Sequence, residues 1–132
     1  MEVVKGFPPN IIEIRKHLKP PKGAIFCYGS KVYNPSGGEI PPDIELHEHV
    51  HIKQQSAYTS PEVWWAKYLL DVRFRRLQEL EAYSKQYRFV KDALGAKAAK
   101  ECLDELSDNM SSPQYKLEIT KHQAETMIRK SI

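Results

Sequence analysis

The chain has 132 residues, of which 41% are hydrophobic and 28% charged, and its formal net charge at pH 7 is +3. This length and composition predict a single globular domain over residues 1–132, with a modest core and no apolar run long enough to cross a membrane. The basic residues are spread along the chain without a dense patch, which disfavours nucleic acid as a partner.

The N-terminal sequence MEVVKGFPPN contains an acidic residue and two prolines but no continuous apolar stretch, so it does not fit a secretory signal peptide. Cys27 and Cys102 lie far apart and form no CxxC pair, which indicates neither a zinc ribbon nor a disulfide framework. Reduced thiols suit a cytosolic protein, and we therefore expect a cytoplasmic location.

The N-terminal half predicts short elements separated by prolines. Residues 10–18 are expected to form a helix, because proline pairs on both sides cannot continue it. β-Branched and aromatic residues predict a strand over 24–33, followed by a turn and a further short strand near 39–40. Asp43 is expected to cap a helix over 44–56, since its carboxylate can accept the free N–H groups of the first turn.

The C-terminal half predicts longer helices. Ser60 as N-cap and Pro61 at the first helical position predict a helix over 61–93, in which the weak helix formers Asp71 and Val72 indicate a bend or break. Of the segments that follow, AKAAKECLDELSDNM predicts a helix, SSPQYKLEI a loop with a few extended residues, and KHQAETMIRK a terminal helix. The predicted fold class is α+β, mostly helical, with one small β-sheet near the N-terminal side.

His47, Glu48 and His51 spell H-E-x-x-H within the helix expected over 44–56. Residues four apart on an α-helix lie about 40° apart in projection, so both imidazoles can reach one point. Glu48 lies about 100° from His47, beside both imidazoles, where a carboxylate can act as a general base on water. The pattern predicts a Zn²⁺ site with His47 and His51 as ligands, and the alternative is a chance cluster on a solvated helix. His49 falls about 160° from His47, which indicates a packing or surface role.

A catalytic zinc takes three protein ligands and leaves a fourth position for water, so a third ligand is needed. The segment RLQELEAYSKQ offers Glu79 as the favoured ligand and Glu81 as the alternative. Glu79 projects onto the apolar side of its helix, where an unpaired charge is costly; a metal with two histidines would partner it, or else Arg75 or Arg76. Glu81 projects outward with Lys85, and a surface ion pair explains it sufficiently.

The motif at 47–51, followed after a WW-containing helix by FRRLQELEAYSKQ, resembles small metallopeptidases of the gluzincin type, especially compact ones predicted in bacteriophage genomes. In that type the third ligand is a glutamate on the next helix, often in an E-x-x-A setting, and E-L-E-A at 79–82 matches it with Glu79 as ligand. The resemblance covers roughly residues 24–90, and SSPQYKLEI is similar too. His49 departs from the family pattern, which usually has an uncharged residue there, and leaves a second metal contact open.

The resemblance implies a zincin-like fold and a zinc endopeptidase-like hydrolase that acts on a protein or peptide substrate. Zinc lowers the pKa of a water molecule towards about 7, and Glu48 takes its proton as the water attacks a peptide carbonyl. A second donor shares the oxyanion; Tyr83, one turn from Glu79, is the candidate, with a core aromatic as the alternative. The strand over 24–33 would hold the substrate backbone in extended form.

The remaining polar and aromatic residues near the motif have simpler explanations. Gln54 and Gln55 lie near the ligand face, where contacts to the ligands and plain solvation explain them equally well. Trp64 and Trp65 point in different directions on one helix and are predicted to be core anchors rather than stacking platforms.

Three functions follow from these patterns. The leading prediction is a zinc-dependent metallopeptidase in the cytoplasm, or in the host cytoplasm if the protein is phage-encoded. The first alternative is a catalytically inactive domain of the same fold that binds zinc or a protein partner. The second is a small basic nucleic-acid-binding module, for which the scattered Lys and Arg residues are the sole support.

Overall fold

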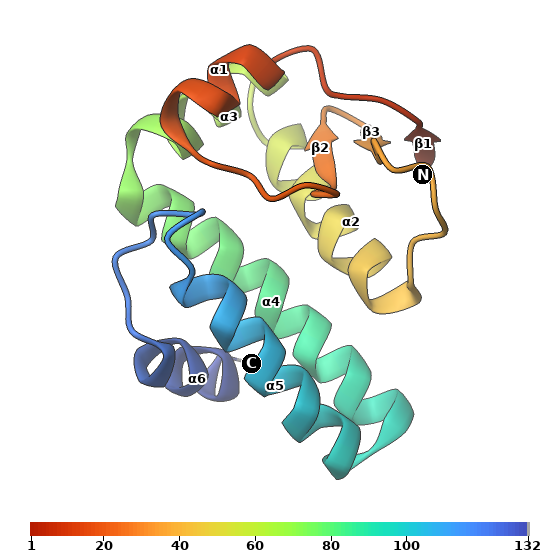
Figure 1. The fold of residues 1–132 in the computed structure, drawn as a ribbon, viewed down its shortest axis with the longest axis vertical. Helices are drawn as coiled ribbons and strands as arrows, with labels where there is room; N and C mark the ends of the chain where they lie inside the picture. Colours follow the sequence, from red (N-terminus) through yellow and green to blue (C-terminus); the bar gives the residue numbers. More distant parts are fainter. Residues whose placement is uncertain (132) are drawn as a thin grey trace.

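The computed structural model describes residues 1–131 of the chain, and a long helix, α4, forms its centre. The elements follow in the order β1 (Glu2–Val4), α1 (Ile11–His17), β2 (Phe26–Tyr28), β3 (Lys31–Tyr33), α2 (Pro42–Ser56), α3 (Pro61–Leu70), α4 (Val72–Leu94), α5 (Ala96–Ser111) and α6 (Lys121–Lys130). In Figure 1 the sheet, α1, α2 and α3 lie above α4, and α5 and α6 lie below it. The predicted class, α+β and mostly helical with one small sheet near the N-terminus, is confirmed.

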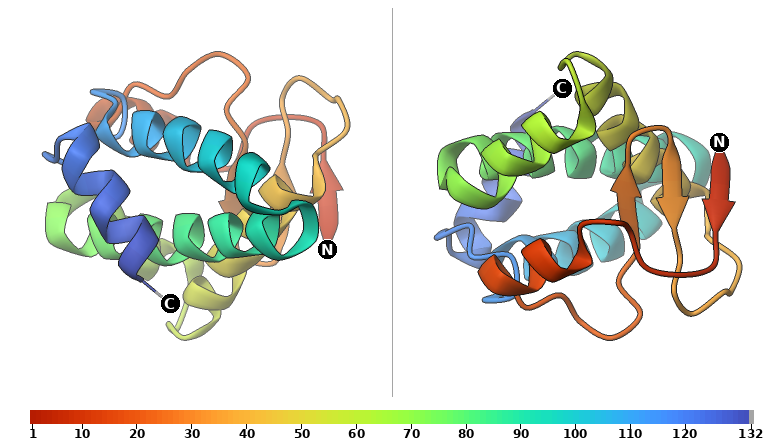
Figure 2. Two further views of the ribbon diagram at one scale, coloured as in Figure 1. Left: turned by 90° about the horizontal axis from the view of Figure 1, so that it is seen from below. Right: turned by 90° about the horizontal axis from the view of Figure 1, so that it is seen from above.

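The N-terminal segments form a three-stranded sheet with the order β1–β3–β2, seen in the right-hand view of Figure 2. β1 runs parallel to β3, and β2 runs antiparallel to β3 with Cys27 opposite Val32. The prediction of one continuous strand over 24–33 is wrong, because the chain reverses at Gly29 and forms two strands. Gly29 has a φ of 63°, a left-handed conformation that glycine adopts without a steric cost and that permits this tight hairpin.

The strand predicted near 39–40 is also wrong. Within the described part of the chain these two residues have no regular structure and lead directly into Pro41, the N-cap of α2. The third strand is instead β1, which pairs Glu2 with Lys31 across a long stretch of sequence. A strand of three residues carries too short a pattern to be recognised without its partner.

The predicted helices are confirmed, with two changes in how they begin. Helix α2 starts at Pro42, so Asp43 lies in its first turn and makes no capping hydrogen bond. The expected break between α3 and α4 falls at Asp71, whose carboxylate accepts hydrogen bonds from the backbone N–H groups of Arg73 and Phe74. The break is therefore a true N-cap, a stronger reason than weak helix propensity.

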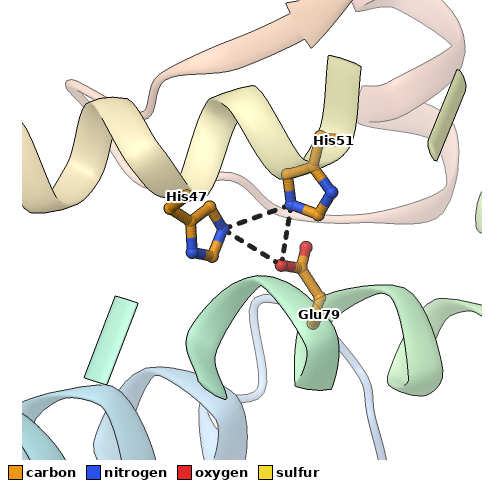
Figure 3. Close-up of side chains that lie close together, drawn as sticks. All are labelled: His47, His51 and Glu79. Atoms are coloured by element: carbon orange, nitrogen blue, oxygen red, sulfur yellow. Dashed lines mark hydrogen bonds and ion pairs between the residues drawn. The ribbon is translucent and has the colours of Figure 1, made fainter. Parts of the chain in front are cut away.

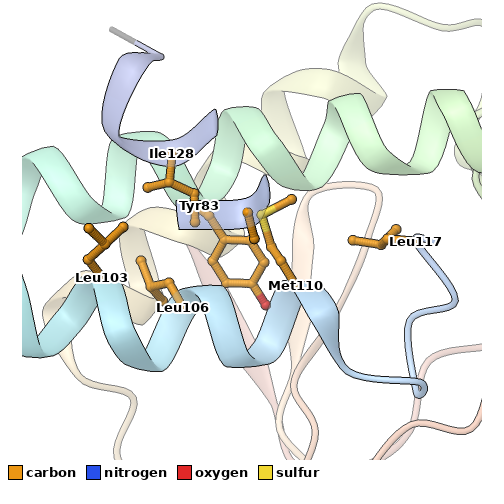
Figure 4. Close-up of a cluster of buried hydrophobic side chains, with 7 residues drawn as sticks. Tyr83, Leu103, Leu106, Met110, Leu117 and Ile128 are labelled. Atoms are coloured by element: carbon orange, nitrogen blue, oxygen red, sulfur yellow. The ribbon is translucent and has the colours of Figure 1, made fainter. Parts of the chain in front are cut away.

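Two apolar clusters stabilise the arrangement on either side of α4. One joins α4 to α5 and α6, and Figure 4 shows its side chains, among them Tyr83, Leu103, Leu106, Met110, Leu117 and Ile128. The other joins α1, β2 and α3 around Trp64 and Trp65, which are 1% and 8% exposed. Both tryptophans are core anchors, as predicted, and truncation of such a side chain costs about 3–5 kcal/mol.

Among residues 1–131, no helix has both the length and the apolar character that crossing a lipid bilayer needs.

The cap at Asp71 gives a first test of the fold. We expect Asp71→Ala to lower the free energy of unfolding by about 1 kcal/mol, because two N–H groups at the start of α4 lose their acceptor. Denaturant unfolding measures the change. Asp71→Asn is the matched control and should stay within a few tenths of a kcal/mol of the wild type, since asparagine caps equally well; equal losses in both variants would contradict the capping role.

Candidate metal centre

His47 and His51 lie one turn apart on α2 and point towards Glu79 of α4 (Figure 3). The Nε2 atoms of the imidazoles are 3.2 Å apart, and Oε1 of Glu79 lies 3.3 Å from that of His47 and 3.1 Å from that of His51. All three residues are buried, with exposed fractions of 8%, 6% and 4%. The structure thus brings together the three predicted ligands in a group that could hold a metal ion, here called the acceptor triad.

The protonation of His51 follows from its contact with Gln54. His51 Nδ1 lies 2.8 Å from Gln54 Oε1, while Gln54 Nε2 donates to the carbonyl oxygen of Gln78 at 3.0 Å and to Oε1 of Glu81 at 2.8 Å. Because a carbonyl and a carboxylate can only accept, the amide nitrogen of Gln54 must face them and its oxygen must face the imidazole. His51 Nδ1 therefore carries a proton and donates it.

A second glutamine, Gln86 of α4, contacts His47 in the same way. His47 Nδ1 lies 3.0 Å from Gln86 Oε1, and Gln86 Nε2 donates to Oδ2 of Asp43 at 2.8 Å. Since the Asp43 carboxylate accepts, Gln86 presents its oxygen to His47, whose Nδ1 is a donor as well. Asp43, predicted to be a helix cap, instead anchors the glutamine that orients a ligand of the acceptor triad.

These tautomers decide what the acceptor triad can bind. A neutral imidazole with its proton on Nδ1 has a lone pair on Nε2, so two lone pairs and a carboxylate oxygen converge within about 3 Å of one another. Three acceptors at that distance, removed from water, repel one another unless a proton or a metal cation lies between them. The donor set of two nitrogens and one oxygen fits a divalent metal ion.

When no metal is bound, a proton on His51 Nε2 can supply the positive charge between these acceptors. Burial raises the pKa of the Glu79 carboxyl, but the two imidazoles outweigh burial and hold it well below its usual range. Burial lowers the pKa of His51, and the Glu79 carboxylate overcomes this and raises it to about 9. The second carboxylate oxygen of Glu79 accepts a hydrogen bond from the hydroxyl of Tyr68, which fixes the carboxylate plane. A buried anionic acceptor at this position therefore stabilises positive charge.

The competing explanations for the two glutamates are resolved by their contacts. Glu81 is half exposed, pairs with Lys85 at 3.5 Å and accepts from Gln54, so it lies outside the acceptor triad. Arg75 is buried, but its guanidinium donates to backbone carbonyls, including those of Tyr68 and Tyr115, and so does not serve as the partner of Glu79.

Glu48 lies beside the acceptor triad and is 6% exposed. Its Oε2 is 4.0 Å from His47 Nε2, too far for a hydrogen bond but close enough to reach a small molecule held between them. Burial raises the pKa of the Glu48 carboxyl, and the two imidazoles oppose that shift only in part. Glu48 is thus a buried carboxyl group whose uncharged form is favoured by its burial.

Two cavities meet at the acceptor triad. The first cavity, of about 80 Å³, contains the triad and is lined mainly by apolar side chains such as Leu18, Trp64 and Trp65. The second cavity, of about 290 Å³, is more polar and includes Asp43 and Glu105. Six residues line both cavities: Pro21, Ile25, His47, Glu48, Gln114 and Tyr115.

Tyr83, the predicted oxyanion donor, belongs to the apolar cluster below α4 and is 4% exposed (Figure 4). Its ring packs edge-on against that of His47, with the centroids 4.5 Å apart. It lines the second cavity, whereas the acceptor triad as a whole lines the first. The geometry gives Tyr83 a packing contact with one predicted ligand, and its catalytic role stays a prediction.

Gln55 has a role that the sequence left open. Its amide donates to the carbonyl oxygen of Cys27 at 3.0 Å and accepts from the N–H of Gly29 at 2.7 Å, as the backbone of a neighbouring strand would do. Trp65 Nε1 also donates to the Cys27 carbonyl. These side chains occupy the outer edge of β2 at Cys27 and Gly29. His49 is exposed, in agreement with a surface role.

Sequence reasoning missed Tyr68, Gln86 and Tyr115. Gln86 lies seven residues after Glu79 on the same face of α4, a spacing that could have revealed it. Tyr115 comes from a loop and has no periodic signal.

Comparisons with protein-family models, with curated proteins and with solved structures find no match to this chain.

The hydrogen bond from Gln86 to His47 gives a test of the metal centre. We expect Gln86→Leu to lower metal affinity about 10- to 100-fold, because His47 loses the acceptor that sets its tautomer and orientation. Competition with a chromogenic chelator measures the affinity. Lys85→Leu, at the exposed neighbouring position, should leave it unchanged; an unchanged affinity in Gln86→Leu would contradict the orienting role.

A second test separates the two glutamates. Glu79→Gln should abolish stoichiometric metal binding, because the amide cannot supply the negative charge between the imidazoles. Glu81→Gln should keep the metal and change the free energy of unfolding by only a few tenths of a kcal/mol, since glutamine still offers an acceptor to Gln54. Metal content by elemental analysis distinguishes the variants, and the reverse pattern would show that Glu81 is the ligand.

Proposed function

We propose that the protein is a zinc-dependent metallopeptidase, with His47, His51 and Glu79 as zinc ligands and Glu48 as general base. The observation that carries this proposal is the convergence of three buried acceptors beside a fourth buried group, Glu48, that both cavities reach. The proposal includes the relation to compact gluzincin-type metallopeptidases of phages. It also includes a cytoplasmic site of action, which suits the free thiols of Cys27 and Cys102.

The donor set supports zinc in a catalytic rather than a structural role. Structural zinc sites are closed by four protein ligands, whereas catalytic sites keep three and leave one position open. Within residues 1–131 the metal-binding group has three members, and the first cavity opens beside them. Zinc bound there would act as a Lewis acid and lower the pKa of water to about 7.

The residues of the chain divide the chemistry among them. Glu48 takes one proton from water while the water oxygen forms a bond to the carbonyl carbon of the peptide. The carbon–nitrogen bond then breaks, and Glu48 passes the proton to the leaving nitrogen, so that a carboxylic acid and an amine are released. Burial raises the pKa of Glu48, which favours holding the proton between its removal from water and its transfer to the leaving nitrogen.

The two cavities support a peptide as substrate. The first cavity, of about 80 Å³, can take a small apolar side chain, and the second, of about 290 Å³, leaves room for the chain on the other side of Glu48. Residues 24–26 line the first cavity and would offer backbone groups for pairing with an extended peptide.

A second candidate is a catalytically inactive domain that binds zinc or a protein partner. It is favoured by the deep burial of the acceptor triad, since a metal that serves stability needs no access. It leaves the position of Glu48 unexplained, because a buried carboxylate with a raised pKa destabilises a fold that does not use it.

Glu48→Gln separates the two functions. Glutamine keeps the size of the side chain and cannot take up a proton, so we expect one equivalent of zinc and near-native stability but a fall in peptide hydrolysis of about 10²–10⁴-fold. Elemental analysis, thermal unfolding and a peptide-library assay are the measurements. The control is His47→Ala, which should lose both zinc and hydrolysis. If Glu48→Gln loses zinc, or if it keeps full activity, Glu48 is not the general base.

A further inference from the structure

Tyr115 lies where the two cavities meet. It belongs to the loop between α5 and α6, far from the H-E-x-x-H motif in sequence, and lines both cavities together with His47 and Glu48. A peptide that occupied both cavities would contact residues common to the two, and these three side chains are among them. Tyr115 is the hydroxyl-bearing member of the six residues common to both cavities.

The other two tyrosines near the acceptor triad are already engaged. The Tyr68 hydroxyl donates to Oε2 of Glu79, so its proton holds a predicted metal ligand. Tyr83 is packed in the apolar cluster with its ring on His47. Tyr115 is only partly buried, and its hydroxyl accepts a hydrogen bond from that of Tyr83, which leaves the proton of Tyr115 free to be donated. Its hydroxyl is therefore the one best placed to donate to a molecule in the cavities.

The backbone of Tyr115 is fixed to the helix that carries Glu79. Arg75, one turn before Glu79 on α4, donates from Nε to the carbonyl of Tyr115 at 2.9 Å and from Nη2 to that of Lys116 at 2.8 Å. The neighbouring Arg76 donates from Nε to the carbonyl of Leu117 at 3.0 Å. The two arginines hold the loop at a set distance from Glu79.

The loop adopts a backbone conformation that needs such support. Lys116 has a φ of 49° and Glu118 a φ of 60°, left-handed values that are unfavourable for residues with a side chain. Strained backbone of this kind persists where surrounding contacts hold it, and it is found preferentially at functional sites. Here the contacts are those of Arg75 and Arg76, and their effect is to present Tyr115 at the cavities.

We propose that the Tyr115 hydroxyl donates a hydrogen bond to the carbonyl oxygen of the scissile peptide as that oxygen gains negative charge, a role first predicted for Tyr83. The inference rests on the proposed peptidase function and names the residue that completes its site. A preorganised donor of this kind acts mainly on the transition state and little on substrate binding.

The test uses acetohydroxamate as a probe, because its oxygens bind a metal and occupy the place of a carbonyl oxygen that carries negative charge. Binding to the cobalt-substituted protein is followed by the visible absorption of Co²⁺. Tyr115→Phe should keep one equivalent of metal and weaken acetohydroxamate about tenfold or more, the effect of losing a hydrogen bond to a charged group. Tyr83→Phe, which removes the same atom, should change the affinity less than threefold.

A peptide substrate adds a second measurement. With any peptide that the wild type cleaves, Tyr115→Phe should lower kcat about 10²–10³-fold and leave KM within about twofold. Unchanged acetohydroxamate binding in Tyr115→Phe, or a loss confined to Tyr83→Phe, overturns this inference while the peptidase proposal stands. If the wild type binds no metal that depends on His47, the proposed function itself fails.

Discussion

The structure depends on the meeting of two imidazole nitrogens and one carboxylate oxygen between α2 and α4. His47, His51 and Glu79 bring three acceptors within 3.1–3.3 Å of one another in a buried interface. Such a group is unstable unless a proton or a metal ion supplies positive charge, so the packing of the two helices and the binding of a positive charge are coupled. That coupling explains why a polar group stands in a helix interface otherwise flanked by two apolar clusters.

The surrounding side chains are arranged to keep these acceptors in place. A glutamine lies behind each histidine, and a carboxylate anchors each glutamine: Gln54 on Glu81, and Gln86 on Asp43. Glu79 is held in turn by Tyr68. Each bond removes a rotational freedom from a predicted ligand, and Nδ1 of each histidine contacts a neutral amide oxygen. The predicted ligands are thus oriented before any metal arrives.

One face of α4 carries most of the functional contacts. Arg75, Glu79 and Gln86 follow at spacings of four and seven residues, and they hold the Tyr115 loop, supply the carboxylate and orient His47. Their relative positions are set by a single rigid helix. Side chains on one helix are held in more precise relative positions than side chains on separate loops. A site built on a helix therefore keeps its geometry when the surrounding loops move.

Short-range spacing was sufficient to predict the helices and to single out His47, Glu48, His51 and Glu79, with Glu81 as the alternative to Glu79, as candidate site residues. The H-E-x-x-H pattern and the inward side of Glu79 depend on the period of one helix, and Pro61, Asp71 and Gly95 mark helix ends through local backbone chemistry. Short-range spacing could not predict three other features. They are the parallel pairing of β1, the contacts of Gln86 with His47 and Asp43, and the position of Tyr115, which Arg75 fixes. These contacts join residues about forty positions apart, or a strand to a distant hairpin, and they exist because the packing of α2, α4 and the last loop brings them together. A local sequence pattern does not show that two such distant residues are in contact, since each partner by itself is an ordinary polar or β-forming residue.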